Sequence, residues 1–354
     1  MIMIKLWKAG NEMEKKLTIR ESFRLGKGWH LMIFAILAML VTNAGVNDGL
    51  NVALPEIAKG AGLDYELCLS MGTVAGFVGV AMMLVIAKIR DRFGGRKVSA
   101  ALFIIFGLTF YFLFLRAENI VMYALSQCIM VSCGQGCFYL CTGPMQSTWF
   151  PKKRGVVNGI STIGANIGTA ILAPVMTVLL TMAEYKTSLS VFAVAAIVLG
   201  IYAYITLRDD PMDAGMYPDN VTKEEYERDY KNLAEQNEYV SDWTIPKMLK
   251  CKEVWLTAIV PGFITLGLLG IITQFVQRNT SLGMSNTAAI SAMTIAGLVG
   301  IIGSYAIGYI DTKLGTKKAC MIYCGIFAAG ILFNLLAEFW FPLVYVSIFI
   351  VGFS

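Results

Sequence analysis

The chain contains 354 residues, of which 56% are hydrophobic and only 15% are charged. Because an average soluble domain is about 45–50% apolar and about 25% charged, this composition excludes an ordinary water-soluble enzyme. Lys and Arg together number 29 and Asp and Glu 24, a net charge of +5 that is too small to indicate a nucleic-acid partner.

Long apolar runs recur along the whole chain and predict membrane-spanning helices. A helix needs about 20 mostly apolar residues to cross a hydrocarbon core about 30 Å thick. The runs therefore predict an all-α membrane protein with nine complete spans and part of a tenth. Their ranges are 28–56, 66–88, 97–116, 119–148, 154–182, 186–207, 251–277, 284–309, 317–337 and 341 onward.

The positions of the basic residues predict how these spans are oriented. Cytoplasmic loops of membrane proteins carry an excess of Lys and Arg, and 25 of the 29 basic residues lie before the first span or in every second connection after it. The remaining connections hold only Lys59, Arg116, Lys186 and Arg278. We therefore expect a multi-pass protein of the cell (plasma or inner) membrane, in contact with lipid, whose N-terminus is cytoplasmic.

A polar middle segment at 208–250 divides the chain into two parts. We expect a cytoplasmic N-terminal arm at 1–27, a six-helix bundle at 28–207, this middle loop, and a partial second bundle at 251–354. The run from Val221 to Tyr239 has the composition of a surface helix or a flexible linker. A connecting role is the simplest interpretation of the middle segment, and a regulatory role is the alternative.

A short pattern occurs twice, after the second and after the eighth span. It reads Asp91-Arg92-Phe93-Gly94-Gly95-Arg96-Lys97 in the first copy and Asp311-Thr312-Lys313-Leu314-Gly315-Thr316-Lys317-Lys318 in the second. Each copy has an acid, a glycine four residues later and a closing basic pair. Glycine permits a sharp turn with positive φ, and the basic pair suits the anionic inner surface of a membrane. Two copies separated by six spans indicate an internal duplication.

The two loops resemble the signature of the major facilitator superfamily, which is a Gly, three residues, and then Asp-Arg-x-Gly-Arg-Arg. The sequence departs from it at Ala87, Gly95 and Gly308. The resemblance implies two pseudo-symmetric six-helix bundles that rock about a central cavity. On this basis the second bundle should continue for about 76 residues past Ser354, so that about ten of twelve helices are present. The chain would then be either truncated or a carrier that lacks its last two helices.

Two further stretches resemble the group of oxalate:formate antiporters and monocarboxylate carriers. One runs from Trp149 to Gly155, with Asn158-Gly159-Ile160, Gly164 to Gly168 and Pro174 after it, and the other runs from Asp213 to Asp219. This resemblance implies a secondary antiporter or symporter of a small carboxylate, coupled to protons or to a counter-substrate. The alternatives are a carrier of a neutral or cationic solute, and a sensor or decayed carrier that transports nothing.

Polar side chains inside the spans are candidate cavity residues, because an unsatisfied polar group in hydrocarbon costs several kcal/mol. In the first span Asn43, Asn47 and Asn51 recur every four residues, which places them on one helix face with Asp48 beside them. They either line a substrate cavity, with Asp48 as a proton carrier, or bridge helices, with Asp48 near the external mouth.

Further candidates lie on the fourth and seventh spans. On the fourth, Gln135 and Tyr139 are four residues apart and, with Gln127, form either a second cavity wall or interhelical bonds. Those on the seventh span are Gln274, Gln277 and Arg278. The guanidinium of Arg278 suits a carboxylate, although the residue is equally consistent with a solvated loop charge.

The family resemblance also implies gating roles for the repeated loops. The gating candidates are Asp91, Arg92, Gly94, Arg96, Lys97, Asp311, Gly315, Lys317 and Lys318. In the family the acid of the first loop meets the eleventh helix and that of the second meets the fifth, which here begins near Gly155. The sequence contains no Walker loop, zinc-ligand spacing or nucleophile elbow. We therefore expect no enzymatic activity, no cofactor and no metal site.

Overall fold

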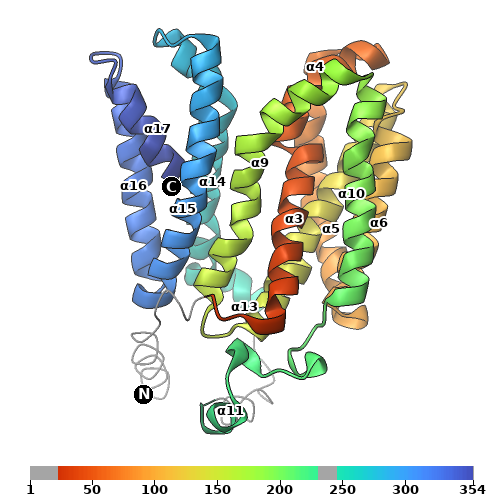
Figure 1. Cartoon of the computed structure of the whole chain (residues 1–354), viewed down its shortest axis with the longest axis vertical. Helices are drawn as coiled ribbons and strands as arrows, with labels where there is room; N and C mark the ends of the chain where they lie inside the picture. Colours follow the sequence, from red (N-terminus) through yellow and green to blue (C-terminus); the bar gives the residue numbers. More distant parts are fainter. Residues whose placement is uncertain (1–22, 230–244, 354) are drawn as a thin grey trace. The chain divides into compact units, whose positions relative to one another are not determined.

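The computed structural model describes residues 23–229 and 245–353, which form helices joined by short connections (Figure 1). These residues contain no β-strand, and the all-α prediction is confirmed. Most of the predicted N-terminal arm and residues 230–244 of the middle segment lie outside the described residues.

The elements follow one another along the chain as short and long helices. In order they are η1 (Gly26–Gly28), α3 (Trp29–Val46), α4 (Asp48–Ala61), α5 (Tyr65–Phe93), α6 (Gly95–Thr109), the π-helix η2 (Phe110–Phe114), α7 (Ile120–Gly136), the π-helix η3 (Cys137–Thr142), α8 (Gly143–Trp149), α9 (Arg154–Met182), α10 (Tyr185–Thr206), η4 (Met212–Ala214), η5 (Pro218–Asn220), α11 (Lys223–Asp229), α13 (Ile245–Lys250), α14 (Lys252–Ser281), α15 (Asn286–Leu314), α16 (Thr316–Leu336) and α17 (Leu343–Phe353).

Within the described part of the chain, eight helical segments are long and apolar enough to cross a membrane. They are Gly26–Val46, Tyr65–Phe93, Gly95–Phe114, Ile120–Trp149, Arg154–Leu172, Tyr185–Thr206, Thr287–Leu314 and Thr316–Leu336. These match the predicted first to sixth, eighth and ninth spans. The predicted seventh span lies in α14 and the start of the tenth in α17, neither of which is among the eight.

The helices form two compact units. The first comprises residues 23–220 with 297–320 and 353, and the second comprises 221–229, 245–296 and 321–352. The second half of α15 therefore packs with the helices of the first sequence repeat. Residues 208–220 of the middle segment also belong to the first unit.

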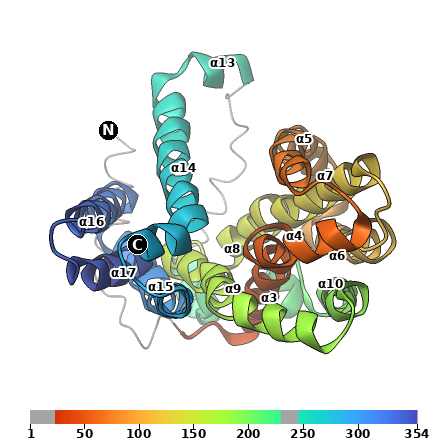
Figure 2. The same cartoon turned by 90° about the horizontal axis from the view of Figure 1, so that it is seen from above.

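Three helix pairs organise the first unit: α6 packs against α10, α5 against α7, and α3 against α9 (Figure 2). A row of buried aromatic side chains runs through its core on α6 and η2. The ring centroids are 6.0 Å apart for Phe103 and Phe106, 6.3 Å for Phe106 and Phe110, and 5.1 Å for Phe110 and Phe114. Such aromatic pairs contribute about 0.5–1.5 kcal/mol each beyond the area they bury.

The predicted first span is two helices rather than one. The break falls at Asn47, whose φ of −117° and ψ of −112° lie outside the helical region. An Asn side chain competes with the backbone for hydrogen bonds, and Asn47 donates to the side-chain oxygen of Asn43 at 2.7 Å. The break interrupts the helical periodicity on which the shared face of Asn43, Asn47 and Asn51 depends.

The predicted fourth span is one continuous path of α7, the π-helix η3 and α8. A π-turn widens the helix and shifts the faces of the residues that follow it. It begins at Cys137, between Gln135 and Tyr139. Gln135 is half-buried while Tyr139 is 57% exposed, so the simple four-residue spacing does not describe their surroundings.

The two repeated loops have the backbone conformation that their glycines predict. Gly94 has φ +84° and Gly315 has φ +81°. The sequence pattern places the turn glycine four residues after the acid in both copies, which makes Gly95 the counterpart of Gly315. This correspondence is wrong by one residue, because Gly95 is the first residue of α6. The turn of the first copy therefore comes three residues after its acid, and the turn of the second copy comes four residues after.

The second unit has a small apolar core formed by α14, the first part of α15 with the turn before it, the turn after α16, and α17. Its buried side chains are Phe275, Met284, Ala289, Ala292, Ala337, Val344 and Ile348. Many large apolar residues of α14 are exposed, Phe263 and Leu266 among them. Exposed apolar faces of this kind suit helices that are solvated by lipid.

Candidate functional site

The first turn of α9 meets the last turn of α15 inside the first unit. The side chain of Asp311 lies directly against Gly155, and the hydroxyl of Thr312 accepts a hydrogen bond from the backbone N–H of Val156 at 3.1 Å. That N–H is one of the donors that a helix leaves unpaired at its start. A carboxylate near a helix N-terminus is also stabilised by the helix dipole, by about 0.3–1 kcal/mol.

Close backbone packing continues from this point along α9 and α15. A side chain at Gly159 would collide with the carbonyl group of Ser304, and one at Gly308 with the carbonyl of Gly155. Further along, Gly297 lies against Ala170. Small residues allow helix backbones to approach closely in lipid. We call this line of contacts the α9–α15 contact.

A polar bridge crosses the α9–α15 contact. The side-chain amide of Asn166 donates to the carbonyl of Gly300 at 2.8 Å and to the hydroxyl of Ser304 at 2.6 Å. At about 1.5 Å per residue, Asn166 lies roughly 18 Å along α9 from Arg154, and Ser304 roughly 15 Å before the end of α15. Both positions correspond to the middle of a hydrocarbon core about 30 Å thick.

The amides of the first span lie beside the same stretch of α9. Asn47 donates to Asn43, and Asn43 donates to the carbonyl of Ala165 at 3.4 Å. Gly168 leaves room for the side chain of Asn43. Asn43, Asn47, Asn166 and Ser304 form what we call the polar row, which runs from α3 across α9 to α15. The side chains of the predicted neighbours Asp48 and Asn51 lie outside those that the structure describes.

Sequence reasoning missed Asn166 and Ser304 as site residues. Asn166 stands inside the stretch from Gly164 to Gly168 that carries the family resemblance, and Ser304 precedes the second repeated loop. The available signal was a polar residue at the centre of each of two apolar spans, on opposite sequence repeats.

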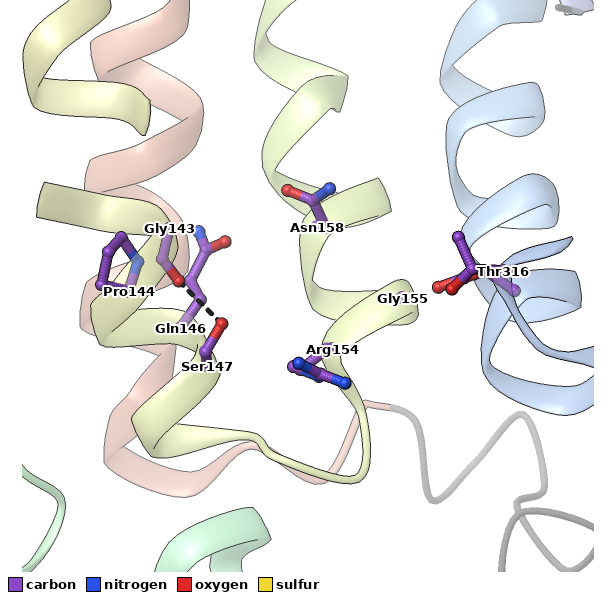
Figure 3. A pocket seen from close by; sticks show the side chains of 9 residues that line it. Gly143, Pro144, Gln146, Ser147, Arg154, Gly155, Asn158 and Thr316 are labelled. Atoms are coloured by element: carbon purple, nitrogen blue, oxygen red, sulfur yellow. Dashed lines mark hydrogen bonds between the residues drawn. The ribbon is translucent and has the colours of Figure 1, made fainter. Parts of the chain in front are cut away.

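A pocket of about 700 Å³ opens beside the Asp311 end of the α9–α15 contact (Figure 3). It is lined by Gly143, Pro144, Gln146, Ser147, Arg154, Gly155, Asn158, Asp311 and Thr316. One carboxylate oxygen of Asp311, Oδ1, is buried and has no hydrogen-bond partner in the part of the chain that the structure describes. The buried amide of Gln146 donates to the hydroxyl of Ser161 at 2.6 Å. Among the polar residues that line the pocket, Ser147, Arg154, Asn158 and Thr316 are exposed.

The gating candidates of the first loop have local partners. Asp91 forms an ion pair of 2.7 Å with the adjacent Arg90, and Arg92 lies over the ring of Phe93. Arg96 donates through Nε to the carbonyl of Tyr204 at 2.8 Å and lies over that ring. Lys97 is exposed, as are Lys317 and Lys318 in the second copy.

Of the candidates on the fourth span, Gln127 and Gln135 lie on α7 and Tyr139 lies in η3. Gln127 is 2% exposed, and its side-chain nitrogen has no hydrogen-bond partner among the described residues. This buried donor is a candidate polar position that the structure leaves unsatisfied. Gln135 is half-buried and Tyr139 is exposed.

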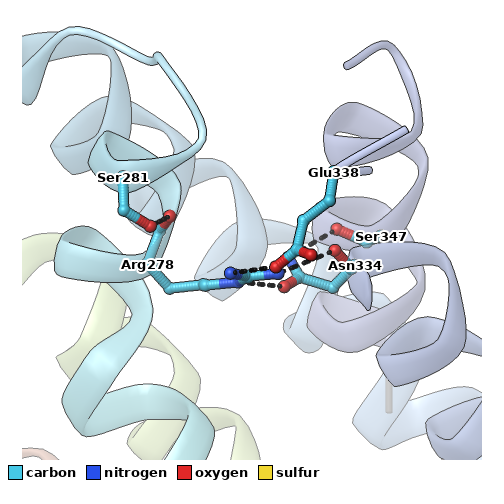
Figure 4. Close-up of polar contacts among 5 residues, drawn as sticks. All are labelled: Arg278, Ser281, Asn334, Glu338 and Ser347. Atoms are coloured by element: carbon cyan, nitrogen blue, oxygen red, sulfur yellow. Dashed lines mark hydrogen bonds and ion pairs between the residues drawn. The ribbon is translucent and has the colours of Figure 1, made fainter. Parts of the chain in front are cut away.

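Arg278 is the centre of a polar network in the second unit (Figure 4). It forms an ion pair of 2.8 Å with Glu338, and its Nε donates to the side-chain oxygen of Asn334 at 3.2 Å. Asn334 in turn donates to the hydroxyl of Ser347 at 3.2 Å. Arg278 thus ties α14 to α16 and its following turn. Gln277 is exposed, and the side chain of Gln274 lies outside those described.

Comparison with known proteins relates the chain to membrane carriers. The family model described as the Major Facilitator Superfamily matches residues 31–354. An uncharacterised MFS-type transporter of Escherichia coli K12, YhjX, is 22% identical over 305 residues, which cover 86% of this chain and 67% of that protein. Monocarboxylate transporter 12 of Rattus norvegicus is 25% identical over 211 residues, or 55% of this chain and 43% of that protein.

Solved structures show the same fold. The proton:xylose symporter XylE bound to 6-bromo-6-deoxy-D-glucose matches with a TM-score of 0.56 at 16% identity, over 92% of this chain and 78% of that one. A crystal structure of a D-xylose-proton symporter matches with a TM-score of 0.53 at 14% identity, over 92% of this chain and 79% of that one. The chain spans about two thirds of the E. coli relative and less than half of monocarboxylate transporter 12.

Proposed function

The chain belongs to the Major Facilitator Superfamily and is a membrane transporter rather than an enzyme, and from this premise we propose that it moves a small carboxylate by alternating access. The transported acid is coupled to a proton or to a counter-substrate, as antiport or symport. The basic end of the spans, which carries the two repeated loops, faces the cytoplasm. The membrane is the cell (plasma or inner) membrane.

The α9–α15 contact is the observation that carries this proposal. It joins helices of the two sequence repeats through glycine packing and through hydrogen bonds between backbone and side-chain groups. Because these interactions are not covalent, they can break and re-form. At its cytoplasmic end Asp311 and Thr312 meet the start of α9. A carrier that alternates between two openings needs a contact of this kind, which closes one side and then releases it.

The polar row supplies the proposed substrate contacts. When α9 and α15 separate, Asn166 and Ser304 lose their mutual hydrogen bond and face the opened cavity, where each can bind a new partner. A carboxylate accepts from two neutral donors at once, and Asn43 and Asn47 add two further amides. The likeness to monocarboxylate transporter 12 supports the same substrate class.

A neutral solute is the second candidate, and the composition of the polar row favours it. Its four members are amides and a hydroxyl, and Arg278 is paired with Glu338. An uncharged polyol or sugar also accepts and donates hydrogen bonds to such groups. Gln127, Gln135 and Tyr139 on the fourth span, and Gln274 and Gln277 on the seventh, are further proposed contacts for either class.

Uptake into reconstituted vesicles tests transport and substrate class together. Small radiolabelled acids are compared with their matched alcohols and amides, with and without an imposed pH gradient or a loaded counter-substrate. We expect saturable uptake of at least one acid and of none of its neutral analogues. Uptake of the neutral analogues alone would mean that the substrate is a neutral solute and not a carboxylate. Uptake of no compound in any gradient would refute the proposed transport.

Variants of the polar row then test the site itself. Asn166→Ala and Ser304→Ala should raise KM about tenfold, as expected for a lost hydrogen bond to a charged group. Thr162→Val is the matched control on α9, because its hydroxyl donates to Gly159 within the same helix. An unchanged KM in both polar-row variants would contradict their role.

A further inference from the structure

The segment 208–220 packs onto the cytoplasmic end of the first unit and is not a free linker. It follows α10 and contains the short helices η4 and η5, and it includes the run from Asp213 to Asp219 that the family resemblance singled out. We call residues 208–220 the clasp, because side chains and carbonyls of this segment contact three separate connections of the unit.

The first of these connections is the repeated loop between α5 and α6. Asp209 accepts a hydrogen bond through Oδ1 from the backbone N–H of Arg96 at 2.8 Å, and its other oxygen lies beside Gly94. Arg96 is in the first turn of α6, where backbone donors lack helical partners. A carboxylate at this position satisfies such a donor and suits the positive end of the helix.

The second connection is the turn from α8 to α9. Asp219 accepts through Oδ2 from the backbone N–H of Lys152 at 3.0 Å, and its carbonyl accepts from the ammonium of Lys153 at 3.2 Å. The indole of Trp149 donates to the carbonyl of Arg208 at 3.0 Å. Lys153 and Asp219 are both buried, at 8% and 3% exposure.

The third connection leads into α3. Lys27 donates through its ammonium to the carbonyl of Ala214 at 2.8 Å, and its backbone N–H contacts the sulfur of Met216. The ammonium of Lys153 also donates to the carbonyl of Arg24 at 3.3 Å. The same buried cation therefore joins the chain before α3 to the turn before α9.

The backbone of the clasp adds a second observation. Asp219 and Asn220 both have φ +56°, the left-handed region that Asp and Asn adopt more often than other residues with a side chain, and the side chain of Asp219 is buried. Such a conformation persists only where surrounding contacts fix it. The contacts of Asp219 include those with Lys152 and Lys153, directly before the first turn of α9.

We propose that Asp209 and Asp219 are positioning residues for the transport cycle. Asp209 sets the turn of the first repeated loop, and Asp219 sets the start of α9, where Gly155 meets Asp311. The inference rests on the proposed transport function, because its consequence is the rate at which the α9–α15 contact closes and opens. It assigns a mechanical role to a segment whose simplest interpretation from the sequence is a connection.

The test compares three Asp→Asn substitutions within the clasp. Asp209→Asn and Asp219→Asn keep the shape of the side chain and remove its charge, while Asp213→Asn is the matched control because Asp213 is exposed. We expect the first two to lower Vmax per molecule about tenfold, the scale of one charge-assisted hydrogen bond, and to change KM less than about twofold. Asp213→Asn should match the wild type in both.

Trypsin gives a second readout that does not depend on transport. The bonds after Lys152, Lys153 and Arg154 lie in the turn that Asp219 holds, so Asp219→Asn should speed cleavage there about tenfold in membranes with the cytoplasmic face accessible. Asp213→Asn should be cut at the wild-type rate. The protein remaining in the membrane is quantified for every variant.

The outcomes separate this inference from the proposed function. A lower Vmax at an unchanged KM, together with faster cleavage in Asp219→Asn, supports the clasp. The inference is overturned if Asp209→Asn and Asp219→Asn match Asp213→Asn in transport and in cleavage. It is also overturned if these variants only reduce the amount of protein in the membrane and leave transport per molecule unchanged. If the wild-type protein moves no solute but Asp219→Asn is still cleaved faster than Asp213→Asn, the proposed transport is refuted and the contacts of the clasp are supported.

Discussion

The carboxylate of Asp311 lies so close to the α-carbon of Gly155 that a methyl group on residue 155 would overlap it. The same methyl group would also meet the carbonyl of Gly308 and the hydroxyl of Thr312. Three atoms of α15 therefore depend on the absence of a side chain at one position of α9. The relationship connects the second repeated loop to the fifth span through shape as well as charge.

Gly155→Ala should therefore block transport without weakening α9. Alanine has a higher helix propensity than glycine by about 1 kcal/mol, so loss of function cannot be attributed to a less stable helix. We expect the initial rate of uptake to fall at least about tenfold, on the scale of the strain of overpacking a close contact. Gly72→Ala is the control, because in the described part of the chain its added methyl group meets no atom within 4 Å beyond the nearby backbone of its own helix. Equal rates in the two variants would contradict the contact's role.

Asp311 and Thr312 make separable contributions to the same contact. Asp311→Ala should lower the initial rate while leaving the amount of inserted protein unchanged, because the residue lies at a helix end rather than in the apolar core. Thr312→Val removes the acceptor for the N–H of Val156 and keeps the side-chain shape. It should lower the rate severalfold, since an unsatisfied buried donor costs about 1–3 kcal/mol. Wild-type initial rates for Asp311→Ala would refute its gating role.

The span pattern and the repeated loops could be predicted from the sequence because each depends on local chemistry. Apolar length defines a membrane helix, and a glycine turn between basic residues defines the loop. The break at Asn47 and the π-turn at Cys137 could not be predicted, because both depend on how neighbouring helices pack. Gly45 beside the break, for example, contacts Phe110 and Met130.

The candidate site shows the same division. Asn43 and Asn47 could be selected as polar residues in an apolar run. Their partner on α9 is a backbone carbonyl, that of Ala165, and no side-chain pattern indicates a backbone acceptor. Asp209 and Asp219 were hidden for a related reason, since their partners are backbone N–H groups more than 60 positions away in the sequence.

Arg278 and Glu338 should behave as a structural ion pair. The two side chains are 32% and 55% exposed, so their coupling free energy in a double-mutant cycle of thermal stability should be below about 1 kcal/mol. We expect Arg278→Ala and Glu338→Ala to leave KM equally unaffected. If Arg278→Ala alone raises KM for an acid, the guanidinium binds substrate and the structural assignment is wrong.

Gly94 and Gly315 are the turn glycines of the two repeated loops, and the clasp contacts the first of these loops. Comparing alanine substitutions at the two positions therefore tests the contact between the clasp and the first loop. Both have positive φ, and so alanine at either position carries a similar backbone strain of about 1 kcal/mol. A methyl group at Gly94 would also collide with the carboxylate of Asp209, whereas one at Gly315 would meet no atom of the described residues within 4 Å beyond its own chain neighbours.

Gly94→Ala should therefore lower thermal stability more than Gly315→Ala, and the excess should shrink when Asp209→Ala removes the colliding group. The measurement is a double-mutant cycle for residues 94 and 209, with the pair 315 and 209 as its control. Coupling between 94 and 209 reports the clasp contact directly, because the backbone strain of Gly94→Ala is the same with and without Asp209 and therefore cancels in the cycle. If the two alanine variants are equally destabilised, and neither responds to Asp209→Ala, then the clasp exerts no force on the first repeated loop.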